Sequence, residues 1–101
     1  MKILTAMVLL LLASRAASAG EVAITIKNFS FAPMDVTISP GDSVVWKNLD
    51  GEPHTVASAD GLFRSQALDQ NDSFRFTFQK PGTYHYICSI HPNMKAAITV
   101  K

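Results

Sequence analysis

One short segment near the C-terminus holds a cysteine, a histidine and a methionine at three-residue intervals. Cys88, His91 and Met94 form the pattern C-x2-H-x2-M, and a tight loop can aim three side chains spaced in this way at one centre. A further donor is available in His54, which follows Pro53 in a polar stretch upstream. A thiolate with two imidazoles and a weak thioether is the ligand set of a blue-copper electron-transfer centre. These residue types therefore indicate a copper site.

Other chemistry explains these residues less completely. Zinc sites rarely use methionine, and the single cysteine of the chain cannot supply the several thiolates of a closed structural zinc site. A cysteine nucleophile with His91 as its base would leave Met94 and His54 without a role. For each residue alone, a buried cysteine, surface histidines and a core methionine are the simpler explanation. The four together favour the metal site.

The composition describes one small domain of low net charge. The chain has 101 residues, of which 48% are hydrophobic and 17% charged, and its formal net charge is +1. This apolar content is enough for a packed core, and the length suits one domain. Nucleic-acid-binding domains normally carry a basic face and a high isoelectric point, so we expect no nucleic-acid partner.

Residues 1–19 have the features of a cleaved secretory signal peptide. Lys2 precedes an apolar run over residues 3–13, and Ala17-Ser18-Ala19 is a small-residue cleavage motif. The apolar run is shorter than the roughly 20 residues that span a bilayer. We expect cleavage after Ala19, a single mature domain over residues 20–101 without a membrane span, and a periplasmic location. A lone thiol outside the cytosol is normally oxidised or paired, and a metal bond is one explanation for it.

Apolar and polar residues alternate along most of the expected mature chain, which is typical of half-buried strands. The alternating runs are 22–26, 36–38, 44–46, 74–78, 84–88 and 98–100. Pro40-Gly41 and Pro81-Gly82, which lie between such runs, suit type II turns. Short strands separated by turns at this frequency favour an antiparallel sandwich or barrel.

The same alternation predicts which side chains form the core. The expected core consists of Ile24, Ile26, Phe31, Val36, Ile38, Val44, Trp46, Phe74, Phe76, Phe78, Tyr84, Tyr86, Ile98 and Val100. His85 alternates out of phase with its two tyrosine neighbours, so its side chain should point away from the core. We therefore do not count His85 among the candidate ligands.

The sequence resembles the cupredoxin family of small type 1 blue-copper proteins, most closely its amicyanin-like members with a short ligand loop. The similarity covers essentially the whole mature chain and is carried by the segments 29–33, 40–48, 53–56 and 82–94. The resemblance implies an all-β, Greek-key β-sandwich of two sheets with about seven to nine strands. It also implies one type 1 copper ion per chain, with the ligands His54, Cys88, His91 and Met94.

The resemblance further suggests roles for two residues beside the ligands. Asn48 matches an asparagine that, in the family, ties the two ligand loops together through backbone hydrogen bonds, and such outer bonds orient ligands and tune the potential. Asn48 could also be a turn residue, because asparagine is common in turns. Pro92 stiffens the loop and removes a backbone donor near the metal, although it could simply mark a turn.

The resulting hypothesis is an exported, monomeric carrier of single electrons that cycles between Cu(II) and Cu(I) and is not an enzyme. We expect His54 to be buried and His91 to lie near the surface, where redox partners dock transiently on apolar residues. The resemblance suggests a quinoprotein amine dehydrogenase as donor and a c-type cytochrome as acceptor.

Two other functions would use related sites. A copper carrier or storage protein, which delivers copper without transferring electrons, would have the same ligands. A copper oxidase or nitrite reductase would need further metal centres, and three histidines are too few to build them.

Overall fold

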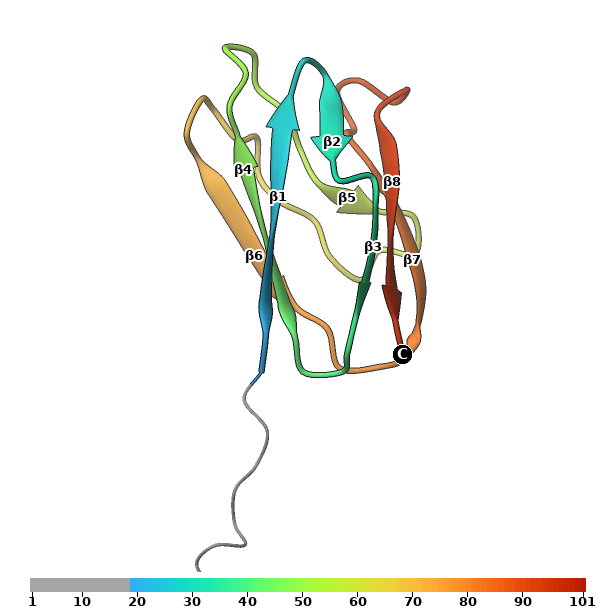
Figure 1. The fold of residues 1–101 in the computed structure, drawn as a ribbon. Coiled ribbons are helices and arrows are strands. Elements are labelled where there is room, and N and C mark those ends of the chain that lie inside the picture. The colour runs from blue at the N-terminus through green and yellow to red at the C-terminus, as the bar shows by residue number, and fades with distance from the viewer. Residues whose placement is uncertain (1–18) are drawn as a thin grey trace, which may run out of the picture.

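The computed structural model describes residues 19–101, which form two four-stranded sheets packed face to face (Figure 1). The strands are β1 (Glu21–Lys27), β2 (Ser30–Ala32), β3 (Asp35–Ile38), β4 (Ser43–Asn48), β5 (Ala57–Ser58), β6 (Ser73–Thr77), β7 (Gly82–Ile87) and β8 (Lys95–Val100). Of the expected signal peptide, residues 1–18 lie outside the described part. Within residues 19–101, no helix has the length and apolar character needed to cross a membrane.

The order of the strands shows that the chain passes repeatedly between the two sheets. The first sheet has the order β2-β1-β4-β6 and the second has the order β3-β8-β7-β5. Strand β1 pairs with β4 in parallel, as β3 does with β8, and the other pairings are antiparallel. The predicted two-sheet Greek-key β-sandwich is confirmed, but its sheets are mixed rather than purely antiparallel. Parallel neighbours need a long crossover between them, and here the chain makes it through the opposite sheet.

All the alternating runs of the sequence overlap observed strands. The run 74–78, for example, corresponds to β6, and the run 84–88 corresponds to β7. Strands β2 and β5 were not predicted, because three and two residues are too few to show an alternation.

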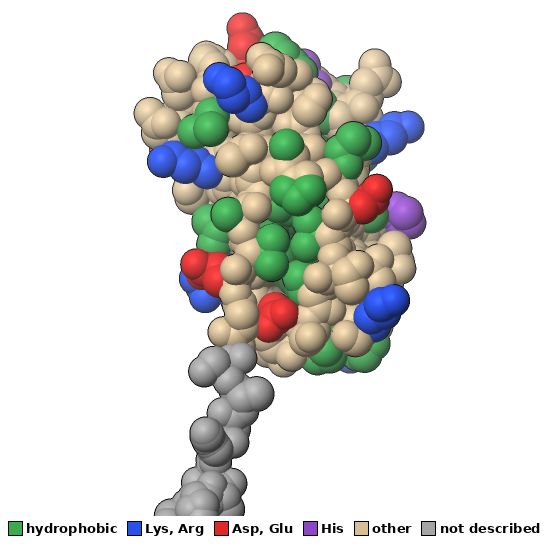
Figure 2. Space-filling model, viewed as in Figure 1, with side chains coloured by type: hydrophobic (Ala, Val, Ile, Leu, Met, Phe, Trp, Pro, Cys, Tyr) green, Lys and Arg blue, Asp and Glu red, His purple; other side chains and the backbone are tan. Residues whose placement is uncertain are grey.

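The surface reflects the low net charge of the chain. On the face drawn in Figure 2, side chains of both charge signs lie around an apolar area between the two sheets. This face therefore has no extended surface of one sign, which a nucleic-acid-binding domain would need.

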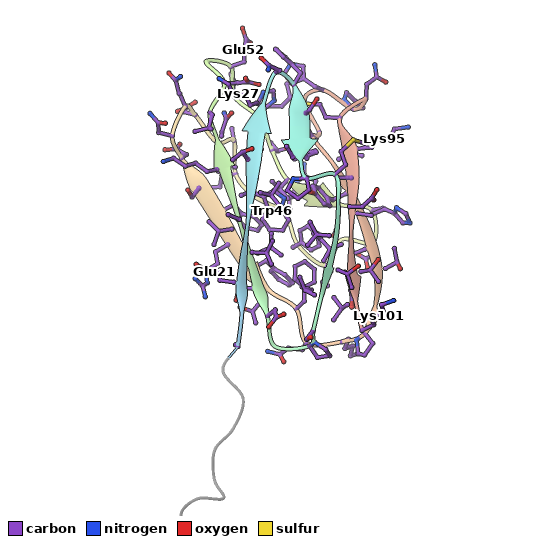
Figure 3. The ribbon with its side chains drawn as sticks, viewed as in Figure 1. Glu21, Lys27, Trp46, Glu52, Lys95 and Lys101 are labelled. Atoms are coloured by element: carbon purple, nitrogen blue, oxygen red, sulfur yellow. The ribbon has the colours of Figure 1, made fainter. Side chains whose placement is uncertain are left out.

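Most of the predicted core is buried, and the centre of the molecule is aromatic. Trp46 lies between the two sheets (Figure 3), stacked on Phe63 at a ring-centroid distance of 5.7 Å and edge-on to Tyr86 at 5.5 Å. Four predicted core residues are only partly buried and pack against the core from its side: Val36, Phe74, Phe76 and Tyr84. Two of these belong to β6, an edge strand with a neighbour on one side only.

The loops that carry the candidate ligands gather at one end of the sandwich. The β1–β2 turn, the β4–β5 connection and the β7–β8 connection lie at the upper end in Figure 1, opposite the start of β1 and the C-terminus. His54 belongs to the β4–β5 connection, and Cys88, His91 and Met94 belong to the β7–β8 connection. The fold therefore brings together residues that are distant in sequence.

At the other end of the sandwich, the turn between β3 and β4 holds the start of β1. The carboxylate of Asp42 accepts hydrogen bonds from the backbone N–H of Ser39 at 2.9 Å and of Gly20 at 2.7 Å. Gly41, in the same turn, has a φ of +96°, a conformation that glycine adopts without strain. The bonds from Ser39 and Gly20 hold the pKa of the Asp42 carboxyl below its ordinary value.

Asp42→Asn should reduce the loss of stability in acid. Because the pKa of Asp42 is lowered in the folded state, its contribution is present above the unfolded-state pKa and is lost as the pH falls through the folded-state pKa. Urea titrations of the metal-free protein between about pH 5 and about pH 3 should show a steeper fall in the free energy of unfolding for the wild type than for the variant. Parallel curves would mean that the two hydrogen bonds do not perturb this carboxyl.

Candidate metal centre

Three potential donor atoms meet at the loop end of the sandwich. The sulfur of Cys88 lies 3.7 Å from Nδ1 of His54 and 3.8 Å from Nδ1 of His91. The three atoms all lie within 4.8 Å of one another. Cys88 and His54 are fully buried, whereas His91 is partly exposed. Donor atoms this close together can share one metal ion, and only one side of the cluster is open toward solvent.

The position of Cys88 follows from strand β7 and from its contact with Thr55. Cys88 comes directly after the last residue of β7 and keeps the inward phase of Tyr86. The backbone N–H of Thr55 donates to the Cys88 sulfur at 3.3 Å. Burial raises the pKa of the Cys88 thiol, but the N–H of Thr55, together with the neighbouring His54 and His91, outweighs this effect and lowers the pKa to about 6. Because the thiolate is the form that binds metals, the surroundings favour the ligand form at neutral pH.

His54 is held on both its backbone and its ring. Its N–H and C=O exchange hydrogen bonds with Leu68, at 3.1 Å and 2.7 Å, in an isolated antiparallel bridge. Its Nε2 lies 2.9 Å from Oδ2 of Asp50. A carboxylate at Nε2 favours the tautomer that carries its proton there, which leaves the lone pair of Nδ1 facing Cys88.

The β7–β8 connection closes on itself around the other two candidate ligands. The N–H of Cys88 donates to the carbonyl of Met94 at 3.2 Å, and the N–H of Met94 donates to the carbonyl of His91 at 2.9 Å. The side chain of Met94 is buried, and Pro92 is exposed next to His91. Met94 therefore lies at the base of the same loop, where it can add a thioether to the cluster.

Asn48 stabilises the first ligand loop. Its buried amide group donates to the carbonyls of Glu52 at 2.9 Å and Leu68 at 2.8 Å, and its Oδ1 accepts from the N–H of Asp50 at 2.9 Å. The resemblance predicted that Asn48 would tie the two ligand loops together. Its side-chain bonds instead stay within the β4–β5 connection and the adjacent Leu68.

The link between the two ligand loops is made by Thr55. Its Oγ1 accepts a hydrogen bond from the backbone N–H of Ser89 at 2.7 Å and lies 2.8 Å from the Ser89 hydroxyl. Thr55 thus contacts both Cys88 and the residue that follows it. The sequence offered one signal for this role, a hydroxyl residue directly after a candidate ligand.

Two further residues at the site were not predicted from the sequence. Asp50 could have been suspected, because it is an acid four positions before His54. Phe29, in the β1–β2 turn, gave no signal, because its contacts join segments far apart in the chain. Its ring meets those of His54 and His91 edge-on, at centroid distances of 5.1 Å and 4.9 Å.

The chemistry of the donors selects among metal ions. Calcium and magnesium require oxygen ligands, and the nearest carboxylate, that of Asp50, faces Nε2 of His54 rather than the side that meets Cys88. A single thiolate with two imidazoles and a nearby thioether suits copper. The residues present therefore fit a copper ion.

The chain is similar to proteins of one family. The model of the cupredoxin-like domain matches residues 1–100. Amicyanin-alpha from Methylorubrum extorquens is 34% identical over 90 residues, which cover 84% of this chain and 76% of that protein. The crystal structure of amicyanin from Paracoccus versutus matches with a TM-score of 0.75 and 31% identity, over 88% of this chain and 87% of that chain.

A larger protein contains a similar domain. A copper-containing nitrite reductase from Thermus scotoductus matches with a TM-score of 0.77 and 32% identity. The match covers 87% of this chain but only 24% of the reductase. The chain thus corresponds to about a quarter of that enzyme.

Asn48→Ala should destabilise the metal-free protein by about 2–3 kcal/mol, because the carbonyl of Leu68 and the N–H of Asp50 lose a buried partner. Chemical denaturation of the metal-free protein measures this change. The exposed amide Gln79 provides the control, and Gln79→Ala should change stability by less than about 0.5 kcal/mol. Equal stabilities of the two variants would contradict the role given to Asn48.

Proposed function

The chain belongs to the cupredoxin-like domain family, and from this membership and the donor cluster we propose that it is an exported type 1 copper protein that carries single electrons. The observation that carries the proposal is the convergence of Cys88, His54 and His91 within 4.8 Å at one end of the sandwich. The cofactor is copper, one ion per chain, held by these three residues and more weakly by Met94.

The proposed ligands suit a centre that changes its charge by one electron. Bound copper would supply the site with two accessible oxidation states, Cu(II) and Cu(I). Soft sulfur favours the reduced ion and imidazole suits the oxidised ion, so the mixed set serves both. Thr55 fixes the sulfur of Cys88, and Asp50 fixes the ring of His54. Because these contacts are made by protein groups and do not depend on the metal ion, the donor atoms need to move little when the electron arrives or leaves.

We propose that electrons enter and leave at His91. It is the one member of the cluster with partial exposure, whereas His54 and Cys88 are fully buried. Three of the most exposed large apolar residues lie next to it or on the adjoining turn and strand ends: Phe29 at 47%, Ile90 at 46% and Met34 at 57%. Lys27 and Glu52 lie at the same end (Figure 3). A small apolar surface with mixed charges at its edge suits transient redox encounters of a monomer.

The resemblance of the sequence to the amicyanin-like group supports two proposed partners. These are a quinoprotein amine dehydrogenase as electron donor and a c-type cytochrome as acceptor. We assign no catalytic step to this chain, because a copper oxidase or nitrite reductase would need a further metal centre and the sequence has only one histidine outside the cluster, His85 on β7.

The proposed cleavage after Ala19 fits the surroundings of Gly20. Its nitrogen lies 2.7 Å from Oδ1 of Asp42, so cleavage would place a new ammonium group against a carboxylate. A hydrogen bond from this ammonium group is stronger than the hydrogen bond from the uncharged backbone N–H that it replaces. A Cβ on residue 20 would lie 3.2 Å from the same oxygen, which favours glycine at this position.

Processing and export can be tested together by intact-mass measurement on the periplasmic fraction of a Gram-negative bacterium that expresses the full chain. The expected mass is that of residues 20–101. A periplasmic product that retains residues 1–19, or a protein confined to the cytoplasm, would contradict this part of the proposal.

The copper assignment predicts a colour that depends on Cys88. Wild-type protein loaded with Cu(II) should be intensely blue through thiolate-to-copper charge transfer, and Cys88→Ser should abolish the colour. His85→Ala, which removes an exposed histidine, should leave the colour unchanged.

Electron self-exchange separates an electron carrier from a copper-delivery protein, and NMR line broadening in mixtures of the oxidised and the reduced blue protein measures its rate. Rapid exchange supports an electron carrier, whereas slow exchange with ready copper transfer to an acceptor supports the copper-delivery alternative.

A further inference from the structure

The β1–β2 turn contains a backbone conformation that needs an explanation. Asn28 and Phe29 have φ values of +53° and +57°. Asparagine tolerates this left-handed region, but a bulky side chain rarely adopts it. Residues held in such conformations cluster at functional sites. Phe29 is also 47% exposed, so burial in the core does not explain why a large apolar residue stands there.

The ring of Phe29 lies against both histidines of the metal centre. It meets the imidazole planes of His54 and His91 at 87° in each case, which is the favourable edge-to-face arrangement. It also lines a surface cleft together with Met34 and Met94. His91 is the cluster residue with solvent exposure, and the Phe29 ring lies directly against it.

One carboxylate holds both the turn and the buried ligand. Oδ1 of Asp50 accepts from the N–H of Asn28 at 2.7 Å, and Oδ2 accepts from the N–H of Phe29 at 2.9 Å. The same Oδ2 lies 2.9 Å from Nε2 of His54. Asp50 therefore fixes the β1–β2 turn, which carries Phe29, relative to His54, which the Phe29 ring contacts. The two N–H bonds also stabilise the left-handed backbone, since a carboxylate accepts them more strongly than a neutral group would.

We propose that Phe29 is a cover over the metal centre, latched by Asp50, which restrains the ring of His91 and excludes small external ligands from the ion. The excluded ligands are water and small anions such as azide. This inference rests on the proposed function in taking the ion to be copper. Phe29 and Asp50 act as positioning residues, because they contact the histidines of the donor cluster and are not members of it.

A simpler role for Phe29 would be that of one more apolar docking residue. Docking alone would alter the rate of reaction with a partner, but it would not alter anion binding or the motion of His91 in the isolated protein. The cover requires both to change. Measurements without any partner therefore separate the two roles.

The test compares Phe29→Ala with Met34→Ala, which removes an exposed residue that lines the same cleft. The free energy of two edge-to-face ring contacts of typical strength corresponds to a change of about tenfold in an equilibrium or rate constant. In the Cu(II) protein, Phe29→Ala should bind azide about tenfold more tightly than the wild type, as measured by absorption spectroscopy. The variant should also lose copper to a chelator about tenfold faster than the wild type. Met34→Ala should stay within about twofold of the wild type.

The metal-free protein gives a second readout that does not need copper. Phe29→Ala should increase the side-chain motion of His91 in NMR relaxation measurements. Asp50→Asn keeps the shape of the side chain but removes its charge, and it should speed amide hydrogen exchange at Asn28 and Phe29 about tenfold. Unchanged exchange in Asp50→Asn would overturn the latch.

The outcomes distinguish this inference from the proposed function. If the wild type is blue but Phe29→Ala matches it in azide binding, copper loss and His91 motion, the cover is wrong and the copper assignment stands. If the wild type does not become blue, the copper assignment fails. In that case, the motion of His91 and the amide exchange rates in the metal-free protein still test the proposed role of Phe29 and Asp50 without copper.

Discussion

The hydrogen bond from the Thr55 backbone to the sulfur of Cys88 is the contact on which the rest of the site depends. A thiolate in a fully buried position is costly unless hydrogen-bond donors face it, and this N–H, at 3.3 Å, is fixed in the backbone. Thr55 directly follows His54, so the same stretch of chain places the first imidazole. Its hydroxyl also accepts from the N–H of Ser89. One residue therefore compensates the buried sulfur and joins the two ligand loops.

The sandwich holds the two ligand loops rigidly and places one side of the cluster toward the core and the other toward solvent. The β4–β5 connection is anchored through the backbone pairing of His54 with Leu68, and the β7–β8 connection is closed between Cys88 and Met94. Loops supported in this way can hold functional residues on a stable scaffold. The buried side of the cluster faces the core, and its partly exposed side, at His91, faces solvent. The same geometry that protects the sulfur thus leaves one short path to the surface.

The sequence predicted what is local and left out what the tertiary fold creates. Half-buried strands such as β6 show alternation, and the C-x2-H-x2-M spacing is local and uses rare residue types, so both were found. Strand β5 is too short to alternate, and the buried Phe63 lies in a segment without periodicity. The contacts of Phe29 and Thr55 join segments far apart in the chain, so the spacing of residues along the sequence does not predict them. Asn48 was identified as important, but its bonding partners depend on loop paths that only the structure gives.

X-ray absorption at the copper edge tests most directly whether these donors share one ion. At neutral pH the oxidised and the reduced protein should both show one close sulfur and two nitrogen neighbours, with nearly unchanged distances, because the protein holds its donors in place. A spectrum without a close sulfur neighbour would contradict the convergence of Cys88 with the two histidines. A change in the number of neighbours on reduction would contradict the rigidity that we assign to the site.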